Sequence, residues 1–315
     1  MKLTILGGGS WGSALGVHLA KNNHQIKIWE FVAEQAKEMQ EKRICRLLPD
    51  APLHQNIFVS SSMEEILPET EILFVVVPSD KVESTLEKAQ SLVKPKIIVI
   101  CSKGFGSNLK LLNKIAEEKF PKADIYCLYG PTHAEEVCKG MFSGIVLAGG
   151  SKKKILQKMI ASKDLKVELS KDIIGVQVCA ALKNILAIFV GLVDGMGLGD
   201  NAKAYVMTKG LEEIKQVGLK MGAKKETFYG LAGIGDMIVT CTSKHSRNHY
   251  VGEQVGKGRK LDEVLSEMKM VAEGITTLQQ AVHLSGKYKL KLPLINGLYE
   301  VLYKGKDPKK VLEEM

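Results

Sequence analysis

The chain has 315 residues, of which 45% are hydrophobic and 25% charged. This composition is typical of ordinary globular proteins, and the length allows two domains with separate cores. The net charge of +9 comes from lysines spread along the chain, since the arginines are only Arg43, Arg46, Arg247 and Arg259. A chain without a dense basic segment is a poor candidate for binding nucleic acid. The excess charge fits an anionic small molecule better, although a solvated lysine-rich surface explains most of it.

Cysteine and histidine usage indicates a reducing compartment and no metal site. The six cysteines form no C-x-x-C pair and mostly fall in apolar runs, which is typical of a cytoplasmic protein. The seven histidines form no metal-binding cluster, and the chain opens on a strand pattern rather than a signal peptide. Residues 173–193 are apolar, but Gln177, Lys183 and Asn184 interrupt them, which favours a buried helix over a membrane span.

A glycine-rich turn near the start carries the first functional signal. Residues 2–6 read as a strand, and residues 13–20 carry apolar side chains at helical spacing. Between them lies G-x-G-x-x-G, made by Gly7, Gly9 and Gly12, with Ser10 and Trp11 inside the turn. In this strand-to-helix context the glycines predict a turn that brings a pyrophosphate against a helix N-terminus, the mark of dinucleotide binding.

The second strand favours NAD as the dinucleotide. Residues 25–29 form this strand, and Glu30 ends it 23 positions after Gly7. A carboxylate at this place accepts hydrogen bonds from the adenosine ribose and repels a 2′-phosphate, which leaves NADP as the alternative cofactor. A solvated glutamate at a strand end is the plain alternative.

Alternating strands and helices predict an α/β domain over residues 1–172. Continuous apolar runs at 72–77, 97–101, 125–129 and 144–148 indicate parallel strands covered on both faces, and 152–170 completes the domain. We therefore expect a Rossmann-like parallel-sheet domain followed by an all-α domain over residues 173–315, with the site between them.

The second half reads as helices alone. Helices are expected at about 173–193, 201–221, 226–241, 248–256, 261–267, 274–286 and 293–303. Asp200 is the expected N-cap of the second helix, and Asp307-Pro308 opens a short final one.

Lys183 is the strongest candidate for chemistry. It lies in the middle of the apolar helix, and its helical neighbours Cys179, Ala180 and Ala187 are small enough to leave room for a ligand. Apolar surroundings disfavour the ammonium form, so we expect a lowered pKa that suits proton transfer. The alternative is a lysine whose amine reaches the surface from a buried helix.

Further polar candidates lie at chain turns. Lys103 follows a strand at the sheet edge where ligands bind, and Thr132 and Glu135 fit a capping box that starts a helix after Gly130-Pro131. Ser246-Arg247-Asn248 precede a helix, and a guanidinium beside orphan N–H donors suits a phosphate or carboxylate. Asp236 is a candidate partner for Lys183 or for a substrate hydroxyl. Solvated loop residues and simple helix caps are the alternatives for all of these.

Several segments together resemble the bacterial-type NAD(P)-dependent glycerol-3-phosphate dehydrogenase family. The glycine turn at 7–14, Ser102-Lys103-Gly104-Phe105, Gly130-Pro131-Thr132, Ala181-Leu182-Lys183-Asn184, Gly233-Ile234-Gly235-Asp236, Ser246-Arg247-Asn248 and Ala272-Glu273-Gly274 are similar to that family's signatures, in order. Three positions depart from its usual pattern: Glu30-Phe31 stands where a basic residue is common, Thr132-His133 replaces Ser-Phe, and Leu47-Leu48-Pro49 replaces aromatic-Leu-Pro.

The resemblance implies reduction of dihydroxyacetone phosphate to sn-glycerol 3-phosphate for phospholipid synthesis, by a homodimer in the cytoplasm. It makes Lys183 the acid/base. The residues implied to bind substrate are Lys103, Gly130, Thr132, Lys183, Asp236, Ser246, Arg247 and Asn248. Those implied to contact the cofactor are Ser10, Trp11, Lys103, Ala134, Arg247, Val271 and Glu273, alongside Gly7, Gly9, Gly12, Glu30 and Phe31.

Two other functions compete with this one. A related dehydrogenase would act on a hydroxy acid, which an assay with short 2-keto acids would detect. A redox-sensing regulator would bind NADH without turnover, but such a sensor needs neither Lys183 nor Arg247.

Overall fold

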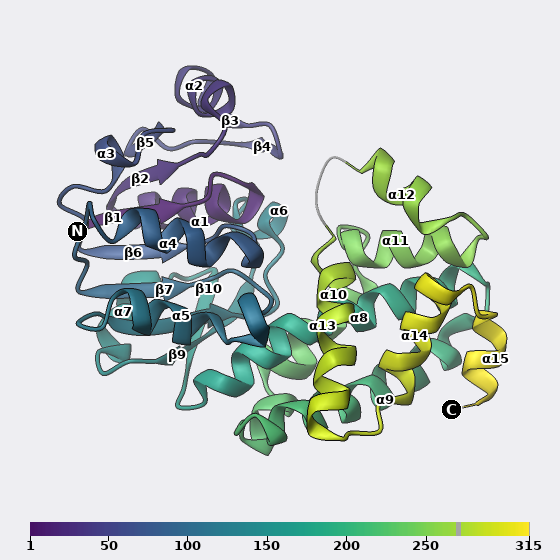
Figure 1. Ribbon diagram of the computed structural model, residues 1–315. Coiled ribbons are helices and arrows are strands. Elements are labelled where there is room, and N and C mark those ends of the chain that lie inside the picture. The colour runs from purple at the N-terminus through teal and green to yellow at the C-terminus, as the bar shows by residue number, and fades with distance from the viewer. Residues whose placement is uncertain (269–271, 315) are drawn as a thin grey trace. The chain divides into compact units, whose positions relative to one another are not determined.

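The computed structural model describes residues 1–268 and 272–314. The chain divides into two compact units, Met1–Ile173 and Ile174–Met315. Figure 1 shows that the first unit contains the sheet with its helices and that the second is built of helices.

An eight-stranded sheet forms the framework of the first unit. Its strand order is β10-β9-β8-β7-β6-β1-β2-β5, and β1 pairs in parallel with both β2 and β6. The chain therefore reverses its direction of winding at β1, which is the switch point where open α/β sheets bind ligands. The strands are β1 Lys2–Leu6, β2 Gln25–Trp29, β5 Ile57–Ser60, β6 Ile72–Val75, β7 Ile97–Ile100, β8 Asp124–Tyr129, β9 Ser143–Gly149 and β10 Leu165–Ser170.

The expectation of parallel strands throughout is wrong at one place. β9 pairs antiparallel with β8, while β10 pairs parallel with β9. The link between β8 and β9 holds only the four-residue helix α6 (Ala134–Val137), whereas a crossover to a parallel neighbour usually contains a longer helix. Apolar runs cannot distinguish the two directions, since β9 is buried either way.

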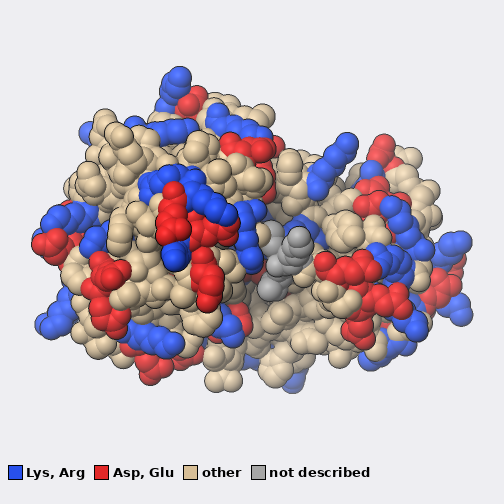
Figure 2. All heavy atoms as spheres, turned by 90° about the horizontal axis from the view of Figure 1, so that it is seen from above, with Lys and Arg blue, Asp and Glu red and all other residues tan. Residues whose placement is uncertain are grey.

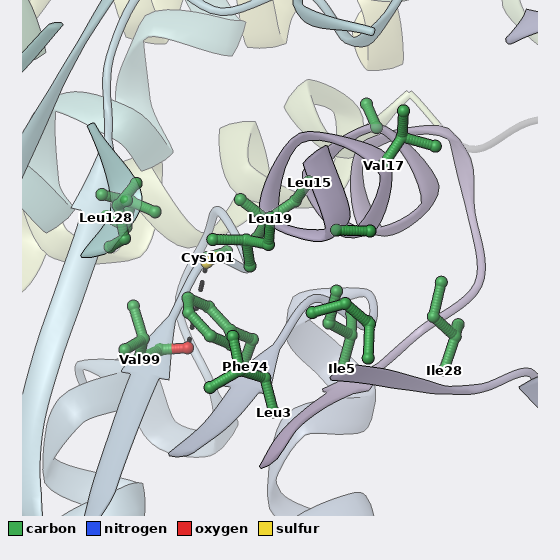
Figure 3. Close-up of a cluster of buried hydrophobic side chains, with 14 of the residues drawn as sticks. Leu3, Ile5, Leu15, Val17, Leu19, Ile28, Phe74, Val99, Cys101 and Leu128 are labelled. Carbon is green, nitrogen blue, oxygen red and sulfur yellow. Dashed lines mark hydrogen bonds between the residues drawn. The ribbon is translucent and has the colours of Figure 1, made fainter. Parts of the chain in front are cut away.

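Helices cover both faces of this sheet. Figure 3 shows Leu15, Val17 and Leu19 of α1 (Ser10–Lys21) above Ile5 and neighbouring strand side chains, within one buried cluster. Figure 1 places α4 and α5 over the opposite face. The remaining helices here are α2 Ala33–Lys42, α3 Met63–Ile66, α4 Val82–Ala89, α5 Leu112–Lys119 and α7 Lys153–Ile160, with 3-10 turns at Ser79–Lys81 and Ser107–Leu109 and a small hairpin of β3 (Ile44–Cys45) and β4 (Leu48–Pro52).

The second unit is built around one long apolar helix, α8 (Ile173–Gly195). Among the described residues it alone is long and apolar enough to cross a membrane, but 89% of its most apolar window is buried inside the protein. Its companions are α9 Gly199–Lys220, α10 Asp236–Thr242, α11 Arg247–Gly256, α12 Leu261–Glu267, α13 Glu273–Tyr288, α14 Pro293–Lys304 and α15 Pro308–Glu313.

Two expectations for these helices are wrong. Asp200 is not the cap of α9, because that helix begins one residue earlier with Leu198 at the cap position. Residues 226–241 do not form one helix: a 3-10 turn over Lys225–Tyr229 and a π-helical turn over Leu231–Gly235 precede α10. Gly233 permits this tight path, because a Cβ there would lie 2.3 Å from the Phe228 carbonyl oxygen. The expected cap at Asp307 is confirmed, since its carboxylate accepts a hydrogen bond from the Lys309 N–H.

A buried carboxylate fixes α14 to α9. Glu213 is 4% exposed and accepts hydrogen bonds from the N–H groups of Leu294 and Ile295, at 2.7 and 3.0 Å. Burial raises the pKa of Glu213 to about 7, although both backbone hydrogen bonds act in the opposite direction. Its charge therefore changes within the physiological pH range.

Candidate active site

The glycine turn has the close packing that its sequence predicts. Gly7 has φ +120°, and a Cβ on it would lie 2.9 Å from the Val76 carbonyl at the end of β6. A Cβ on Gly12 would lie 1.9 Å from the Gly7 oxygen, so only glycine lets α1 approach β1 this closely. A Cβ on Gly9 would meet no described atom within 4 Å, and no side chain caps the first turn of α1. The turn thus presents open space beside backbone N–H donors, as a pyrophosphate requires.

Glu30 lies against this turn. A Cβ on Gly8 would lie 2.7 Å from its Oε2, and its Oε1 accepts a hydrogen bond from the Val32 N–H at 3.1 Å. The ring of Phe31 is 71% exposed and meets the Trp29 ring edge-on, with centroids 5.9 Å apart. A carboxylate and an exposed aromatic ring thus flank the position expected for an adenosine.

A hydrogen-bond network fixes the sheet edge that precedes Lys103. The Tyr129 hydroxyl, at the end of β8, donates to the Ser102 carbonyl at 2.7 Å, and the Ser102 hydroxyl donates to the Val77 carbonyl at 2.5 Å. Gly104 follows with φ +130°. These contacts connect the ends of three neighbouring strands and set the backbone on which Lys103 stands.

The neighbouring turn after β8 corrects one expectation. Thr132 does not form a capping box with Glu135, because α6 begins after His133 without a side-chain cap. The Thr132 hydroxyl instead donates to the Gly130 carbonyl at 3.2 Å. A Cβ on Gly130 would lie 2.9 Å from the Gly144 oxygen, so close strand packing requires glycine there. Ala134, 7% exposed, is the first residue of α6.

In the helical unit, the amine of Lys183 is buried beside a carboxylate. Its exposure is 4%, and its Nζ donates a 2.6 Å hydrogen bond to Oδ1 of Asp236, which is 1% exposed. Nζ also donates to the hydroxyl of Thr240, which in turn donates to the Asp236 backbone carbonyl at 2.6 Å. The proposed partnership of Lys183 with Asp236 is present. Thr240, one helical turn after Asp236, was missed, although its i+4 spacing would have indicated it.

The candidate anion-binding turn begins α11. The Ser246 hydroxyl accepts a hydrogen bond from the His249 N–H at 3.2 Å and so caps the helix that Arg247 opens. The Asn248 side-chain oxygen accepts a 3.0 Å hydrogen bond from the Gly274 N–H, which ties this turn to the start of α13. Glu273 is the first residue of α13, and Val271 lies outside the described residues.

Charge on the molecular surface is mixed. On the face drawn in Figure 2, lysine and arginine side chains lie among acidic ones and, within the residues that the structure describes, form no continuous basic patch. Among the described residues, no group of three or more His, Cys, Asp or Glu side chains could hold a metal ion. All six cysteines are free and buried.

Comparison with known proteins covers the whole chain. Residues 2–155 match the family model for the NAD-dependent glycerol-3-phosphate dehydrogenase N-terminus, and residues 172–313 match that for the C-terminus. A glycerol-3-phosphate dehydrogenase (NAD(P)+) from Thermoanaerobacter sp. is 38% identical over 98% of this chain and 94% of its own. One from Bacillus mycoides is 40% identical over 98% and 93%.

A solved structure gives the same answer. The crystal structure of glycerol-3-phosphate dehydrogenase from Coxiella burnetii superposes with a TM-score of 0.96, covers 99% of this chain and 97% of its own, and is 30% identical. The sheet order, the glycine turn at the end of β1 and the following helical unit agree with these matches. The chain therefore belongs to the NAD-dependent glycerol-3-phosphate dehydrogenase family.

Proposed function

We propose that the protein reduces dihydroxyacetone phosphate to sn-glycerol 3-phosphate, the precursor of glycerophospholipids, with NADH as the preferred reductant. The buried Lys183 amine carries the proposal. It is hydrogen-bonded to a carboxylate and a hydroxyl, in a chain that matches both family models of NAD-dependent glycerol-3-phosphate dehydrogenase. A buried amine needs such partners, and active sites are where such pairs concentrate.

The first unit has the features that a nicotinamide dinucleotide needs. Open space at Gly9, an uncapped start of α1 and the close approach of Gly12 to Gly7 would seat the pyrophosphate, while Ser10 and Trp11 occupy the helix start. Glu30 would accept hydrogen bonds from the ribose hydroxyls and repel a 2′-phosphate, which supports NAD over NADP. When bound, the cofactor supplies a hydride to the substrate carbonyl carbon.

Lys183 acts as the proton donor. As the carbonyl carbon accepts the hydride, the N–H bond of the ammonium breaks and the carbonyl oxygen takes the proton, which yields the secondary alcohol. Asp236 and Thr240 hold Nζ throughout and keep it directed, and the positive charge stabilises the developing alkoxide. The reverse reaction uses the neutral amine as the base.

The turn of Ser246, Arg247 and Asn248 binds the substrate phosphate. A guanidinium offers a planar pair of donors that matches a phosphate, and the start of α11 adds backbone N–H groups and the positive end of the helix dipole. The remaining substrate contacts come from Lys103, Gly130 and Thr132. The remaining cofactor contacts come from Ala134, Val271 and Glu273.

The test is oxidation of NADH by the purified protein with dihydroxyacetone phosphate, compared with pyruvate and other short 2-keto acids. We expect turnover with the phosphorylated ketone alone. Lys183→Met should lower kcat by about 100- to 10,000-fold, the range of general acid catalysis, while NADH binding measured by fluorescence persists. Activity confined to a 2-keto acid would favour a hydroxy-acid dehydrogenase.

Binding of NADH without turnover of any ketone would favour a regulator instead. Arg247→Ala tests whether Arg247 binds the substrate phosphate. This variant should raise the KM for dihydroxyacetone phosphate far more than it changes kcat. An unaltered KM would remove Arg247 from the substrate site.

A cytoplasmic location and a homodimer complete the proposal. Six free, buried thiols suit a reducing compartment. Analytical ultracentrifugation at micromolar concentration tests the dimer, which a single monomeric species would exclude.

A further inference from the structure

Two helices of the second unit touch backbone to backbone. A Cβ on Gly252 of α11 would lie 1.8 Å from the Ile188 carbonyl oxygen of α8, and one on Gly256 would lie 2.3 Å from that of Leu192. The contact is reciprocal, because a Cβ on Gly191 of α8 would lie 2.0 Å from the His249 oxygen, and one on Gly195 would lie 2.2 Å from that of Glu253. We call these four glycines the glycine seam.

The seam connects the two parts of the proposed substrate site. Lys183 lies eight residues before Gly191 on α8, about 12 Å along the helix axis. Arg247 opens α11, five residues before Gly252. These glycines let the two backbones approach closely, but having no side chains they provide no side-chain hydrogen bond between the helices.

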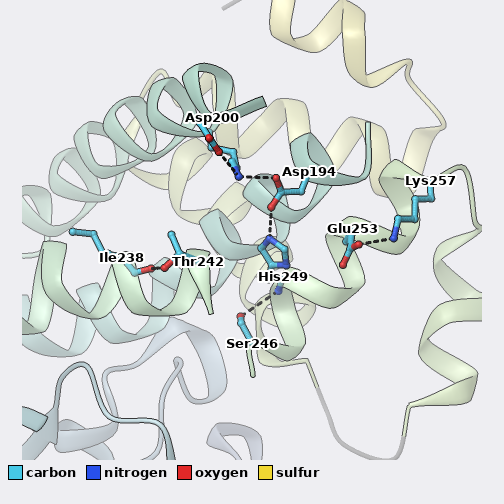
Figure 4. A network of polar contacts seen from close by, with 9 residues as sticks. Asp194, Asp200, Ile238, Thr242, Ser246, His249, Glu253 and Lys257 are labelled. Carbon is cyan, nitrogen blue, oxygen red and sulfur yellow. Dashed lines mark hydrogen bonds and ion pairs between the residues drawn. The ribbon is translucent and has the colours of Figure 1, made fainter. Parts of the chain in front are cut away.

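One polar cluster beside the seam supplies a directional side-chain contact between α8 and α11. Nε2 of His249, on the first turn of α11, lies 2.8 Å from Oδ2 of Asp194 near the end of α8 (Figure 4). Oδ1 of Asp194 pairs with Lys203 of α9 at 2.9 Å, and Lys203 pairs with Asp200 at 2.7 Å. Although partial burial opposes ionisation, the hydrogen bonds from Lys203 and His249 hold the pKa of Asp194 below its usual value, so it remains a carboxylate.

We propose that His249 and Asp194 are positioning residues that lock the phosphate-binding turn at the start of α11 to the helix that carries Lys183. Hydrogen bonds are directional, so this pair adds an orientation-dependent contact that the glycines, which lack side chains, do not provide. The backbone N–H of His249 also donates a hydrogen bond to the Ser246 hydroxyl, which connects this residue to the phosphate-binding turn itself. The inference rests on the proposed function, since it assigns the pair an effect on phosphate affinity.

The experiment replaces His249 by Phe, which keeps a ring and removes the hydrogen bond to Asp194. We expect KM for dihydroxyacetone phosphate to rise about tenfold with kcat within twofold, as for loss of one charged hydrogen bond. With dihydroxyacetone, which lacks the phosphate, kcat/KM should stay within twofold of the wild type. His249→Gln, whose amide N–H can donate to Asp194, should restore most of the affinity for the phosphorylated substrate.

The matched control is Lys257→Met, which removes an ion pair with Glu253 further along the same helix and should leave both substrates unaffected. An unchanged KM in H249F, or an equal loss with both ketones, would overturn the inference. If H249F does not fold, Asp194→Asn tests the pair from its other side; because it also removes the ion pair with Lys203, Lys203→Met is its control. A wild-type enzyme inactive on dihydroxyacetone phosphate would instead refute the proposed function; calorimetric titration with sn-glycerol 3-phosphate would then decide the positioning role.

Discussion

The Lys183 amine and the Asp236 carboxylate, 53 residues apart in the sequence, lie 2.6 Å apart in the helical unit with both side chains almost fully buried. Asp236 occupies the first turn of α10, directly after the π-helical turn, so an irregular backbone delivers the carboxylate to the amine. π-turns of this kind occur frequently at functional sites.

Thr240 should tune the acidity of Lys183. Thr240→Val removes an acceptor from the ammonium and disfavours its charged form, so the basic limb of the kcat profile should move about one pH unit lower. Thr240→Ser keeps the hydroxyl and should retain the wild-type profile. Steady-state kinetics between pH 6 and 10 measures both variants. If the basic limb of the kcat profile does not move in T240V, the hydrogen bond between Lys183 and Thr240 has no role in catalysis.

Glu30 should control cofactor choice. Glu30→Gln keeps a hydrogen-bond acceptor beside Gly8 and removes the charge that repels a 2′-phosphate, so kcat/KM with NADPH should rise about tenfold while that with NADH changes little. Glu34→Gln makes the same charge change on the exposed start of α2 and should not alter the ratio. A wild-type preference for NADPH would refute the assignment.

Glu213 should make stability depend on pH. Its folded-state pKa of about 7 exceeds the ordinary 4.5, so its contribution is fully present below pH 4.5 and is lost as the pH rises through 7. The stability lost between those limits is on the order of 3 kcal/mol.

The difference in free energy of unfolding between wild type and Glu213→Gln should therefore favour the wild type more at pH 5 than at pH 8. Urea titrations at both pH values measure it. Glu212→Gln, at an exposed neighbouring position, provides the control and should show no such trend. A pH-independent difference in the Glu213 variant would mean that this carboxyl group keeps an ordinary pKa.

The glycine seam should admit no side chain. Gly252→Ala places a methyl group 1.8 Å from the Ile188 oxygen and should lower the free energy of unfolding by about 3 kcal/mol. Gly286→Ala, on α13, meets no described atom within 4 Å and should raise it by up to about 1 kcal/mol. Chemical denaturation of the two variants should give opposite signs, and equal effects would show that the seam can open.

Sequence patterns correctly predicted the features that depend on residues close together in the chain. The apolar runs gave β6, β7 and β8, the glycine spacing gave the turn at Gly7, and a lysine in an apolar helix indicated a buried amine, because each follows from neighbours in sequence. The family resemblance, rather than any spacing, supplied the substrate and most of the site residues.

Features that depend on distant contacts were missed or wrong. The antiparallel direction of β9 and the start of α9 at Gly199 leave no periodic signal in the neighbouring sequence. Thr132 has capping chemistry, but its hydroxyl bonds Gly130 instead. The Asp194–His249 pair joins residues 55 apart, for which no sequence period exists.

The glycine contacts between α8 and α11 and the His249–Asp194 pair together oppose movement of one helix along the other. Under the proposed function, the helix contact would then set the separation between the Lys183 amine on α8 and the Arg247 turn on α11. In that case a ketone with one more carbon between carbonyl and phosphate would not contact the amine and the turn together. Discrimination between substrates by molecular length would then be a property of the two helices that carry the site.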